Sequence, residues 1–311
     1  MNQTSIGIIG ADAQGAAIAH ALILNDLVRK ILLVDRRPER AALRAADLNL
    51  AAPSLGIRVQ ASGYEDLGDC DVVIIADRLT RRQDESRLHF LARQVELYGE
   101  NLPKILRYAS GAIFLVAATP INIMTHMTAT HLAEGGVPAG RVMGFGTMLE
   151  TRGFQQILGD YFGFAPQMIN GQILGGHGGQ AVFPWSRARV QSWTLESLMQ
   201  LKGMELTREF QREIEKRVME NGPDGADSPY SVAGAIAQIT RAIVRDEHVI
   251  LPVCRPRKRI SRVENVTLAL PYLIGRQGIL SGPPLELADA EWVALESGAG
   301  VLRQALNELA L

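Results

Sequence analysis

The feature that most restricts the fold of this chain is the alternation, over its first half, of short apolar runs with amphipathic segments. The runs are rich in β-branched residues and cover residues 5–9, 30–34, 58–61, 71–76 and 112–117. Several are apolar throughout, as expected for parallel strands that are buried on both faces. Segments with helical spacing at 13–25 and 39–49 separate the first three runs. This order predicts a doubly wound parallel sheet with right-handed crossovers.

The second half of the chain has a different pattern. Strand-like segments at 171–174 and 181–184 are followed by predicted helices at 207–221 and 230–246, by antiparallel strands at 248–254, 263–271 and 274–280, and by a closing helix at 288–309. A chain of 311 residues is long enough for two ordinary domains. We therefore expect an α/β fold with an N-terminal doubly wound domain over residues 1–145 and a C-terminal α+β domain over residues 146–311.

A glycine-containing loop, Gly10-Ala11-Asp12-Ala13-Gln14-Gly15, connects the first predicted strand to the first predicted helix. A loop in this position is typical of dinucleotide-binding Rossmann domains. Gly10 would form the tight turn and Gly15 would let the helix pack close to the sheet. The pyrophosphate of the dinucleotide would rest on the helix N-terminus, where free N–H groups and the helix dipole favour an anion.

Asp35 ends the second predicted strand, where a carboxylate can bind the ribose hydroxyls of the cofactor. This acid favours NAD over NADP because it would repel a 2′-phosphate, whereas Arg36 and Arg37 beside it argue the other way. Asp12 stands at the central position of the loop, where a glycine is expected. Its carboxylate crowds and repels a pyrophosphate, but it can also move aside, bind a cation or cap the helix. The domain therefore either binds NAD or is a Rossmann-like domain with weakened or lost binding.

His177 lies in the run Gly175-Gly176-His177-Gly178-Gly179. Glycines on both sides indicate a turn or a close backbone approach, and a histidine there is open to a small ligand and can exchange a proton near neutral pH. The alternative is a glycine-rich turn that carries a surface histidine.

The overall composition indicates a globular protein of the cytoplasm. The formal net charge is −1 and 47% of the residues are apolar, which argues against a general nucleic-acid or membrane binder. We expect no signal peptide and no membrane span. Cys70 and Cys254 form no motif, which fits a reducing compartment, and the histidines lack metal-ligand spacing, so we expect no metal site.

The ordered set of motifs resembles the lactate/malate dehydrogenase family over nearly the whole chain. The resemblance starts with the loop at 10–15 and Asp35, and it continues through the segments 81–88, 118–124, 144–152, the His177 run, 235–237, 245–247, 251–253 and 275–278. It implies the Rossmann domain and the substrate domain of that family, with NAD as cofactor and Gly10, Asp12, Ala13, Gln14, Gly15, Asp35, Ala76 and Thr119 at the cofactor site. It also implies a small 2-oxo or 2-hydroxy acid as substrate and a homodimer or homotetramer as assembly.

The resemblance also implies roles for the residues around the substrate. His177 would be the acid/base that exchanges the hydroxyl proton, with Glu150 orienting it and Arg87 polarising the substrate oxygen. Arg81, six residues before Arg87, would pair with a second carboxylate, which favours a malate-like dicarboxylate over lactate. The alternative for this loop is a solvated cluster of arginines. Thr119 would lie on the nicotinamide side.

Several positions depart from the family pattern close to the chemistry. Thr119 replaces an asparagine, Glu150 replaces an aspartate, and Gly179 replaces an acidic residue. Gly153 replaces the arginine that clamps the substrate carboxylate, and Arg152 lies one residue early, about 100° around a helix. Arg152 and Ser228 are nevertheless candidates for the substrate pocket.

Three hypotheses follow for the activity. The first is an NAD-dependent L-2-hydroxy acid dehydrogenase. The second is a non-catalytic member that keeps the fold as an NAD-binding or assembly module, and the third is a related dehydrogenase whose substrate lacks a 2-carboxylate. A separate basic run at residues 255–262 is expected to form an exposed hairpin turn, with an anion site as the alternative.

Overall fold

The structure, a computed structural model, describes residues 4–51, 56–221 and 229–311. A parallel sheet forms the centre of the first half, with the strand order β3-β2-β1-β4-β5-β6. Its strands are β1 (Ser5–Ile9), β2 (Lys30–Val34), β3 (Arg58–Ala61), β4 (Val72–Ile75), β5 (Ile113–Val116) and β6 (Val142–Gly144). The winding reverses between β1 and β4, which are hydrogen-bonded neighbours. In doubly wound sheets the ligand crevice lies outside the carboxyl ends of the strands at this point.

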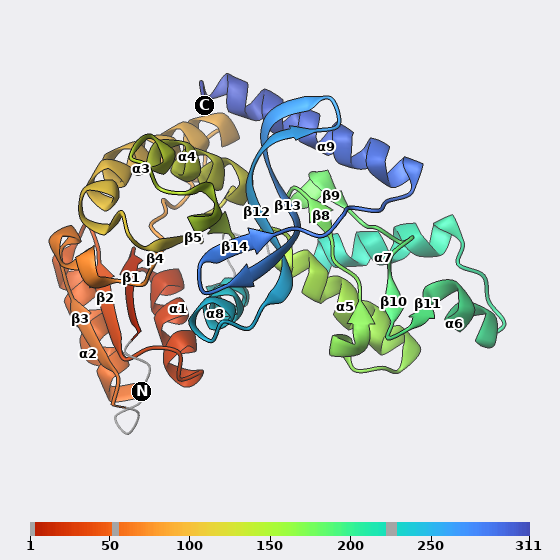
Figure 1. Cartoon of the computed structure of the whole chain (residues 1–311), viewed down its shortest axis with the longest axis horizontal. Helices are drawn as coiled ribbons and strands as arrows, with labels where there is room; N and C mark the ends of the chain where they lie inside the picture. The colour runs from red at the N-terminus through yellow and green to blue at the C-terminus, as the bar shows by residue number, and fades with distance from the viewer. Residues whose placement is uncertain (1–3, 52–55, 222–228) are drawn as a thin grey trace.

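Two pairs of helices cover the two faces of this sheet (Figure 1). Helices α1 (Ala13–Leu24) and α2 (Pro38–Ala51) contact each other on one face, and α3 (Arg87–Ala109) and α4 (Ile121–Glu134) contact each other on the other. The predicted strands and helices of the first half are all present, with bounds that agree within two residues. The doubly wound prediction is therefore confirmed.

Antiparallel strands from the second half continue the same sheet beyond β6. They are β12 (Val249–Ile260), β13 (Val263–Gly275), β14 (Gly278–Ser281), β8 (Leu174–Gly175) and β9 (Ala181–Val182). Cys254 of β12 pairs with Gly144 of β6, so backbone hydrogen bonding crosses the predicted domain boundary. A small separate sheet consists of β7 (Ile169–Asn170), β10 (Arg189–Val190) and β11 (Trp193–Thr194).

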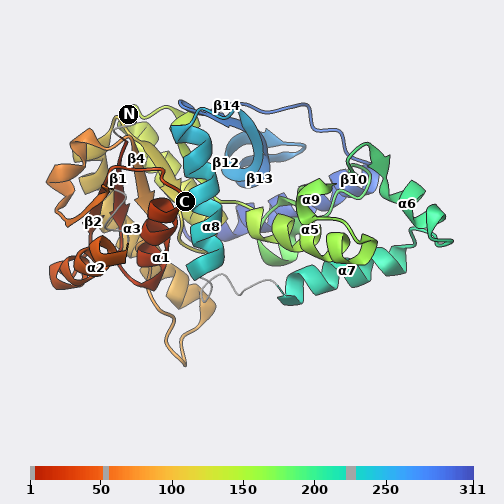
Figure 2. The same ribbon diagram turned by 90° about the horizontal axis from the view of Figure 1, so that it is seen from below.

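The helices of the second half are α5 (Met148–Phe162), α6 (Leu195–Leu201), α7 (Arg208–Asn221), α8 (Pro229–Val244) and α9 (Asp289–Glu308). Helices α5, α6 and α7 lie at the end of the molecule opposite to α2 and β3, whereas α8 packs along α1 (Figures 1 and 2). None of the helices in the described ranges is both long and apolar enough to span a membrane.

Three local expectations were wrong. The predicted strand at 274–280 contains the turn at residues 276–277, because β13 ends at Gly275 and β14 begins at Gly278. The predicted strand at 171–174 is shorter and shifted, because β8 covers only Leu174–Gly175. The basic run at 255–262 is mostly strand rather than turn: β12 continues to Ile260, and Arg259 still pairs with Glu264 of β13. Only Ser261 and Arg262 form the turn. A regular hairpin tolerates these charges because its distal end is exposed to water.

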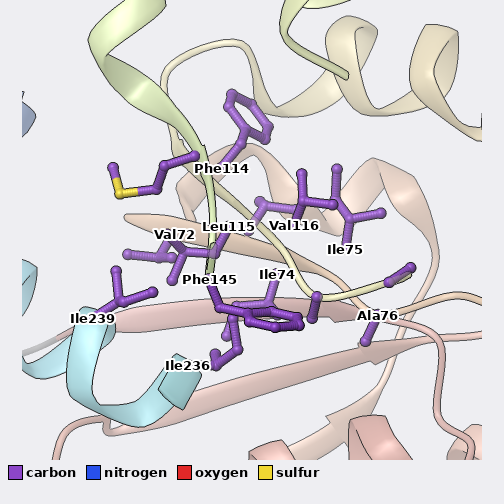
Figure 3. Packing of buried hydrophobic residues seen from close by; sticks show 14 of the residues in the cluster. Val72, Ile74, Ile75, Ala76, Phe114, Leu115, Val116, Phe145, Ile236 and Ile239 are labelled. Atoms are coloured by element: carbon purple, nitrogen blue, oxygen red, sulfur yellow. The ribbon is translucent and has the colours of Figure 1, made fainter. Parts of the chain in front are cut away.

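Two hydrophobic cores hold these layers together. The larger one joins the parallel sheet to α8: Phe145 lies close to Ile74 of β4 and to Ile236 of α8 (Figure 3). The smaller one surrounds α5, where the Phe154 ring packs edge-on against Phe183 and Trp185. Segment 147–177 contributes to both cores, because Leu149 and Leu174 belong to the larger one and Phe154 belongs to the smaller one.

Candidate active site

The loop after β1 has the backbone that a dinucleotide cradle needs. Gly10 has φ +98°, a left-handed conformation that favours glycine. A Cβ atom on Gly10 would lie 2.6 Å from the backbone nitrogen of Asp77, just beyond the end of β4. A Cβ atom on Gly15 would collide with the carbonyl oxygen of Gly10. Both glycines are therefore required by close approach of the loop to β4 and to helix α1.

Asp12 caps helix α1 with its own side chain. Its Oδ1 accepts hydrogen bonds from the backbone N–H groups of Gln14 (2.9 Å) and Gly15 (3.1 Å). Its Oδ2 forms an ion pair with Nε of Arg78 at 2.9 Å. Of the alternatives that the sequence left open for Asp12, the structure supports helix capping, together with pairing to a cationic side chain.

Asp35 lies at the end of β2, as predicted, but its carboxylate is fully enclosed, with a side-chain exposure of 0%. Oδ2 accepts from Ala11 N (2.7 Å) and from the Arg40 guanidinium (2.5 and 2.9 Å), and Oδ1 accepts from Arg37 N (2.8 Å). Burial works to raise the pKa of Asp35, but the hydrogen bonds from Arg40, Arg37 and Ala11 outweigh it and lower the pKa. The carboxylate is thus ionised and already anchors the glycine loop.

A third acid–arginine pair, which the sequence interpretation missed, lies next to these two. Asp77 is buried, with Arg36 Nε at 3.2 Å and an amide hydrogen bond from Asn101 at 3.1 Å. Burial raises the pKa of Asp77, against the effect of Arg36. The available signal was its position directly after Ala76, because residues just beyond the carboxyl ends of β1, β2 and β4 meet at one edge of the sheet.

The other predicted cofactor residues lie around the same crevice. Ala76 is fully buried against the Gly10 turn, and Ala13 is exposed at the first position of α1. The Gln14 side chain is buried and donates to the Ala117 carbonyl at 2.6 Å, so it ties the loop to the end of β5. Thr119 follows shortly after β5, is half-buried and precedes a cis Pro120.

The crevice fits a dinucleotide in its backbone and its charges. Gly10 and Gly15 leave space for the turn, the N-terminus of α1 points its dipole at the site, and Arg78 and Arg36 lie at the crevice, each paired with an acid of the protein. The side chain that opposes the fit is Asp12, because its carboxylate takes two N–H groups of the helix terminus. Residues 10–15 would hold the pyrophosphate of NAD, and Asp35 would hold a ribose hydroxyl only after it releases Arg40 or the N–H group of Arg37.

The structure brings His177 and Glu150 together, as predicted. Nδ1 of His177 contacts Oε1 of Glu150. The Glu150 side chain is 4% exposed and that of His177 is 31% exposed, so the acid is buried and the imidazole is open on another side. Glu150 lies in the first turn of α5, where a helix dipole favours a carboxylate. This is the arrangement of an oriented acid/base histidine.

Buried polar side chains fix the backbone on both sides of this pair. Asn122 accepts a hydrogen bond from His177 N (3.4 Å) and donates to the Thr267 carbonyl (3.0 Å). The Ile173 carbonyl accepts from Thr147 Oγ1 at 2.5 Å, and Ile173 N donates to Thr151 Oγ1 at 3.0 Å. Sequence reasoning did not assign a role to Asn122; its position shortly after the β5 strand was the available signal.

Packing accounts for part of the glycine run around His177. Gly175 has φ +89°, and a Cβ atom on Gly176 would lie 3.0 Å from Leu302 of α9. By contrast, a Cβ atom on Gly179 would meet nothing within 4 Å. The run is therefore partly a close contact with α9 and partly open space beside the histidine.

Residues 81–86, the arginine loop, lie just before α3 and are held in place by the buried Glu85. Glu85 binds Arg93 through two contacts of 2.6 and 2.7 Å and accepts from Arg82 N at 3.1 Å. The hydrogen bonds from Arg93 lower the pKa of Glu85 to about 2. Arg81 donates from Nε and Nη2 to the Glu85 carbonyl, so its guanidinium is bound to its own loop. Arg87 is the first residue of α3, and its side chain lies outside the described part of the structure.

Arg152 points towards α8 rather than towards His177. Its Nη2 donates to the Gly234 carbonyl (3.0 Å) and to Gln238 Oε1 (2.8 Å), and burial lowers its pKa. Beside it, a Cβ atom on Gly153 would meet only Val218 of α7, at 3.5 Å. Ser228, the remaining predicted pocket residue, lies outside the described residues. Within the described ranges, no group of three or more acidic, histidine or cysteine side chains could hold a metal ion.

A doubly wound sheet with a glycine turn at its crevice, followed by a histidine oriented by a buried acid, defines a dinucleotide-dependent dehydrogenase. Comparisons with known proteins identify the family. Residues 4–144 match the lactate/malate dehydrogenase NAD-binding domain, and residues 147–310 match the α/β C-terminal domain of the same family. The chain belongs to the lactate/malate dehydrogenase family, and its cofactor is NAD.

Similar proteins extend over the full length of the chain. The L-lactate dehydrogenase of Geotalea daltonii is 33% identical over 309 residues, covering 98% of this chain and 99% of that protein. The L-lactate dehydrogenase of Thermus aquaticus is 33% identical over 312 residues, with coverages of 98% and 99%. Among solved structures, a lactate dehydrogenase from a deep-sea metagenome library superposes with a TM-score of 0.91 at 24% identity over 100% of both chains. The minor L-lactate dehydrogenase of Enterococcus mundtii gives 0.90 at 24% identity over 99% of both. These two structures confirm the predicted fold.

Proposed function

We propose that this chain oxidises an L-2-hydroxy acid, and reduces the corresponding 2-oxo acid, at His177. The observation that carries the proposal is the contact between His177 Nδ1 and the buried Glu150 carboxylate. When bound, NAD⁺ would accept the hydride from C2 of the hydroxy acid, and NADH would supply it to C2 of the oxo acid.

His177 moves the proton in this proposal. Contact with Glu150 at Nδ1 directs Nε2 away from the acid and towards the open side of the ring. Nε2 then takes the hydroxyl proton during oxidation and returns it during reduction. Glu150 holds the ring orientation and stabilises the imidazolium that forms.

Arg87 is the proposed group that polarises the substrate oxygen, with Thr119 on the nicotinamide side and Ser228 on the pocket wall.

The group that binds the substrate carboxylate is the part of this site that departs most from the family pattern. Gly153 supplies no side chain, and Arg152 has one guanidinium nitrogen committed to α8. We propose that Arg152 serves the carboxylate after its guanidinium turns from Gly234 and Gln238 of α8 towards His177.

The tail of the substrate is a separate proposal. Arg81 favours a dicarboxylate such as oxaloacetate or malate, whereas the similar proteins are named L-lactate dehydrogenases. In this structure the Arg81 guanidinium binds the Glu85 carbonyl, so it must leave its own loop to reach a substrate. We keep the dicarboxylate preference as a prediction for a closed form of the loop.

Oxidation of NADH with a panel of 2-oxo acids tests these proposals. The panel contains pyruvate, oxaloacetate and bulkier 2-oxo acids, with His177→Ala as the inactive variant and His20→Ala, an exposed histidine on α1, as the matched control. Turnover with any of them, lost in His177→Ala only, supports the activity. Arg81→Gln should then lower kcat/KM for oxaloacetate about tenfold to a hundredfold relative to pyruvate, the effect of one lost charge-assisted contact.

A non-catalytic role is the second candidate, and Asp12 together with Gly153 favours it. Such a protein would bind NADH and show no turnover above His177→Ala with the whole panel. A substrate that lacks a 2-carboxylate is the third possibility; it predicts turnover of simple aldehydes or ketones instead. We also propose a homodimer or homotetramer in the cytoplasm, which light scattering and fractionation would test.

A further inference from the structure

The N-terminus of helix α1 already holds an anion that belongs to the protein. The Asp12 carboxylate accepts from the N–H groups of Gln14 and Gly15, and the side chain is 23% exposed. These helix-terminal N–H groups are the donors that a dinucleotide-binding loop offers to a pyrophosphate. The Asp12 carboxylate thus occupies two N–H groups at the positive end of helix α1 that would otherwise be available to the cofactor pyrophosphate.

Arg78 completes this internal anion site. It reaches across from the end of β4, and its Nε lies 2.9 Å from Asp12 Oδ2, with the side chain 20% exposed. The other two cationic side chains at the crevice are similarly engaged by acids, Arg36 by Asp77 and Arg40 by Asp35. Each of these three cations therefore faces a protein carboxylate rather than an open phosphate site.

We propose that Asp12 is a competing internal anion that sets the affinity for NAD, and that Arg78 is exchanged between Asp12 and the bound pyrophosphate. When the dinucleotide is bound, the Asp12 carboxylate turns away from the N-terminus of α1. Its two N–H partners and Arg78 then bind the phosphate oxygens. Asp12 therefore stabilises the free protein and weakens cofactor binding, two effects of opposite sign.

This proposal concerns NAD binding alone and is independent of the substrate and of His177. Its test is a titration with NADH, followed by fluorescence and by calorimetry, together with the unfolding temperature of the cofactor-free protein. Asp12→Gly removes the competing anion. We expect the NADH Kd to fall by about tenfold or more, the effect of one charge-assisted hydrogen bond, while the unfolding temperature decreases because the cap and the ion pair are lost.

The Arg78→Gln variant tests whether the Arg78 guanidinium is exchanged between Asp12 and the bound pyrophosphate. In the wild type, Arg78 is neutralised by Asp12, so its removal should change the Kd by less than about threefold. In the Asp12→Gly background the same substitution should weaken NADH binding about tenfold. Asp12→Asn keeps a helix-capping oxygen and removes the charge, so it should tighten binding even if Asp12→Gly folds poorly.

Thr194→Gly is the matched control, because Thr194 caps α6 by accepting from Ser197 N at 3.1 Å, outside the crevice. It should lower the unfolding temperature without changing the Kd. The proposal is overturned if Asp12→Gly lowers stability with an unchanged Kd, which makes Asp12 only a cap, or if it raises the Kd, which makes Asp12 a cofactor ligand. It is also overturned if Arg78→Gln weakens binding equally in both backgrounds, or if neither the wild type nor the Asp12 variants bind NADH.

Discussion

The carboxylate of Glu150 contacts Nδ1 of His177 from a position that is almost fully buried, whereas the imidazole itself is partly exposed. The acid enters from the first turn of α5, and the backbone of His177 is held separately by Asn122. The orientation of the imidazole ring therefore depends on Glu150, whereas the position of the His177 backbone depends on Asn122.

Replacement of Glu150 by Gln should lower kcat by roughly 10²–10⁴-fold, because the amide keeps the volume but cannot stabilise an imidazolium. The Kd for NADH should stay unchanged, since residue 150 is on α5 and not at the glycine loop. Glu150→Asp should retain more activity than Glu150→Gln. Steady-state kinetics and an NADH titration measure both effects, and equal losses in the Asp and Gln variants would mean that packing, not charge, is what Glu150 supplies.

Glu85 should protect the backbone of the arginine loop from proteolysis. Its carboxylate binds Arg93 and Arg82 N, and its carbonyl binds Arg81. Glu85→Ala should therefore increase the rate of tryptic cleavage after Arg81 and Arg82 several-fold, because local opening exposes the backbone. The control is Glu96→Ala, an exposed acid on helix α3, which begins just after this loop. If both variants are cleaved at the wild-type rate, the Glu85 contacts do not determine the order of this loop.

The parallel sheet could be predicted from sequence because strands buried on both faces leave uninterrupted apolar runs. The His177–Glu150 pair came from a resemblance, and the contact between the two side chains was then found in the structure. The Asp77–Arg36 and Asp12–Arg78 pairs could not be predicted in the same way. They depend on which side chains meet across the ends of neighbouring strands. The periodicity of a segment predicts its own secondary structure, but it does not predict which side chain of another segment will lie beside it. The limits of β12 were missed because the charge at 255–262 was interpreted as a turn, although exposed strand ends also carry charge.

His126 should make the protein less stable in acid. The ring is 1% exposed, its Nδ1 lies 2.9 Å from Thr267 Oγ1, and burial, followed by the nearby Arg303, lowers its pKa to about 4. The unfolded chain takes up this proton near pH 6.5 and the folded chain only near pH 4. Stability is therefore fully present above about pH 6.5 and is lost as the pH falls towards 4, by up to about 3 kcal/mol.

Urea denaturation between pH 7 and pH 4.5 measures this loss. His126→Asn keeps a donor for Thr267 but does not titrate, so its unfolding free energy should fall less steeply with acid than that of the wild type. His20→Asn, at an exposed position on α1, should follow the wild-type curve. Parallel curves for His126→Asn and wild type would rule out a buried neutral histidine at this position.

Two glycines of α5 should respond in opposite directions to the same substitution. A Cβ atom on Gly153 would make only an ordinary contact with Val218, whereas one on Gly159 would lie 2.7 Å from the Phe164 carbonyl. Gly153→Ala should raise the free energy of unfolding by about 0.4–1 kcal/mol by restricting the unfolded chain, and Gly159→Ala should lower it. Chemical denaturation checks the signs, and kinetics on Gly153→Ala then report on the site.

An unchanged kcat/KM would place the substrate away from residue 153, as expected if Arg152 binds its carboxylate. A reduced kcat/KM in a stabilised protein would instead mean that the substrate occupies the space next to residue 153, and the proposed role of Arg152 would be wrong.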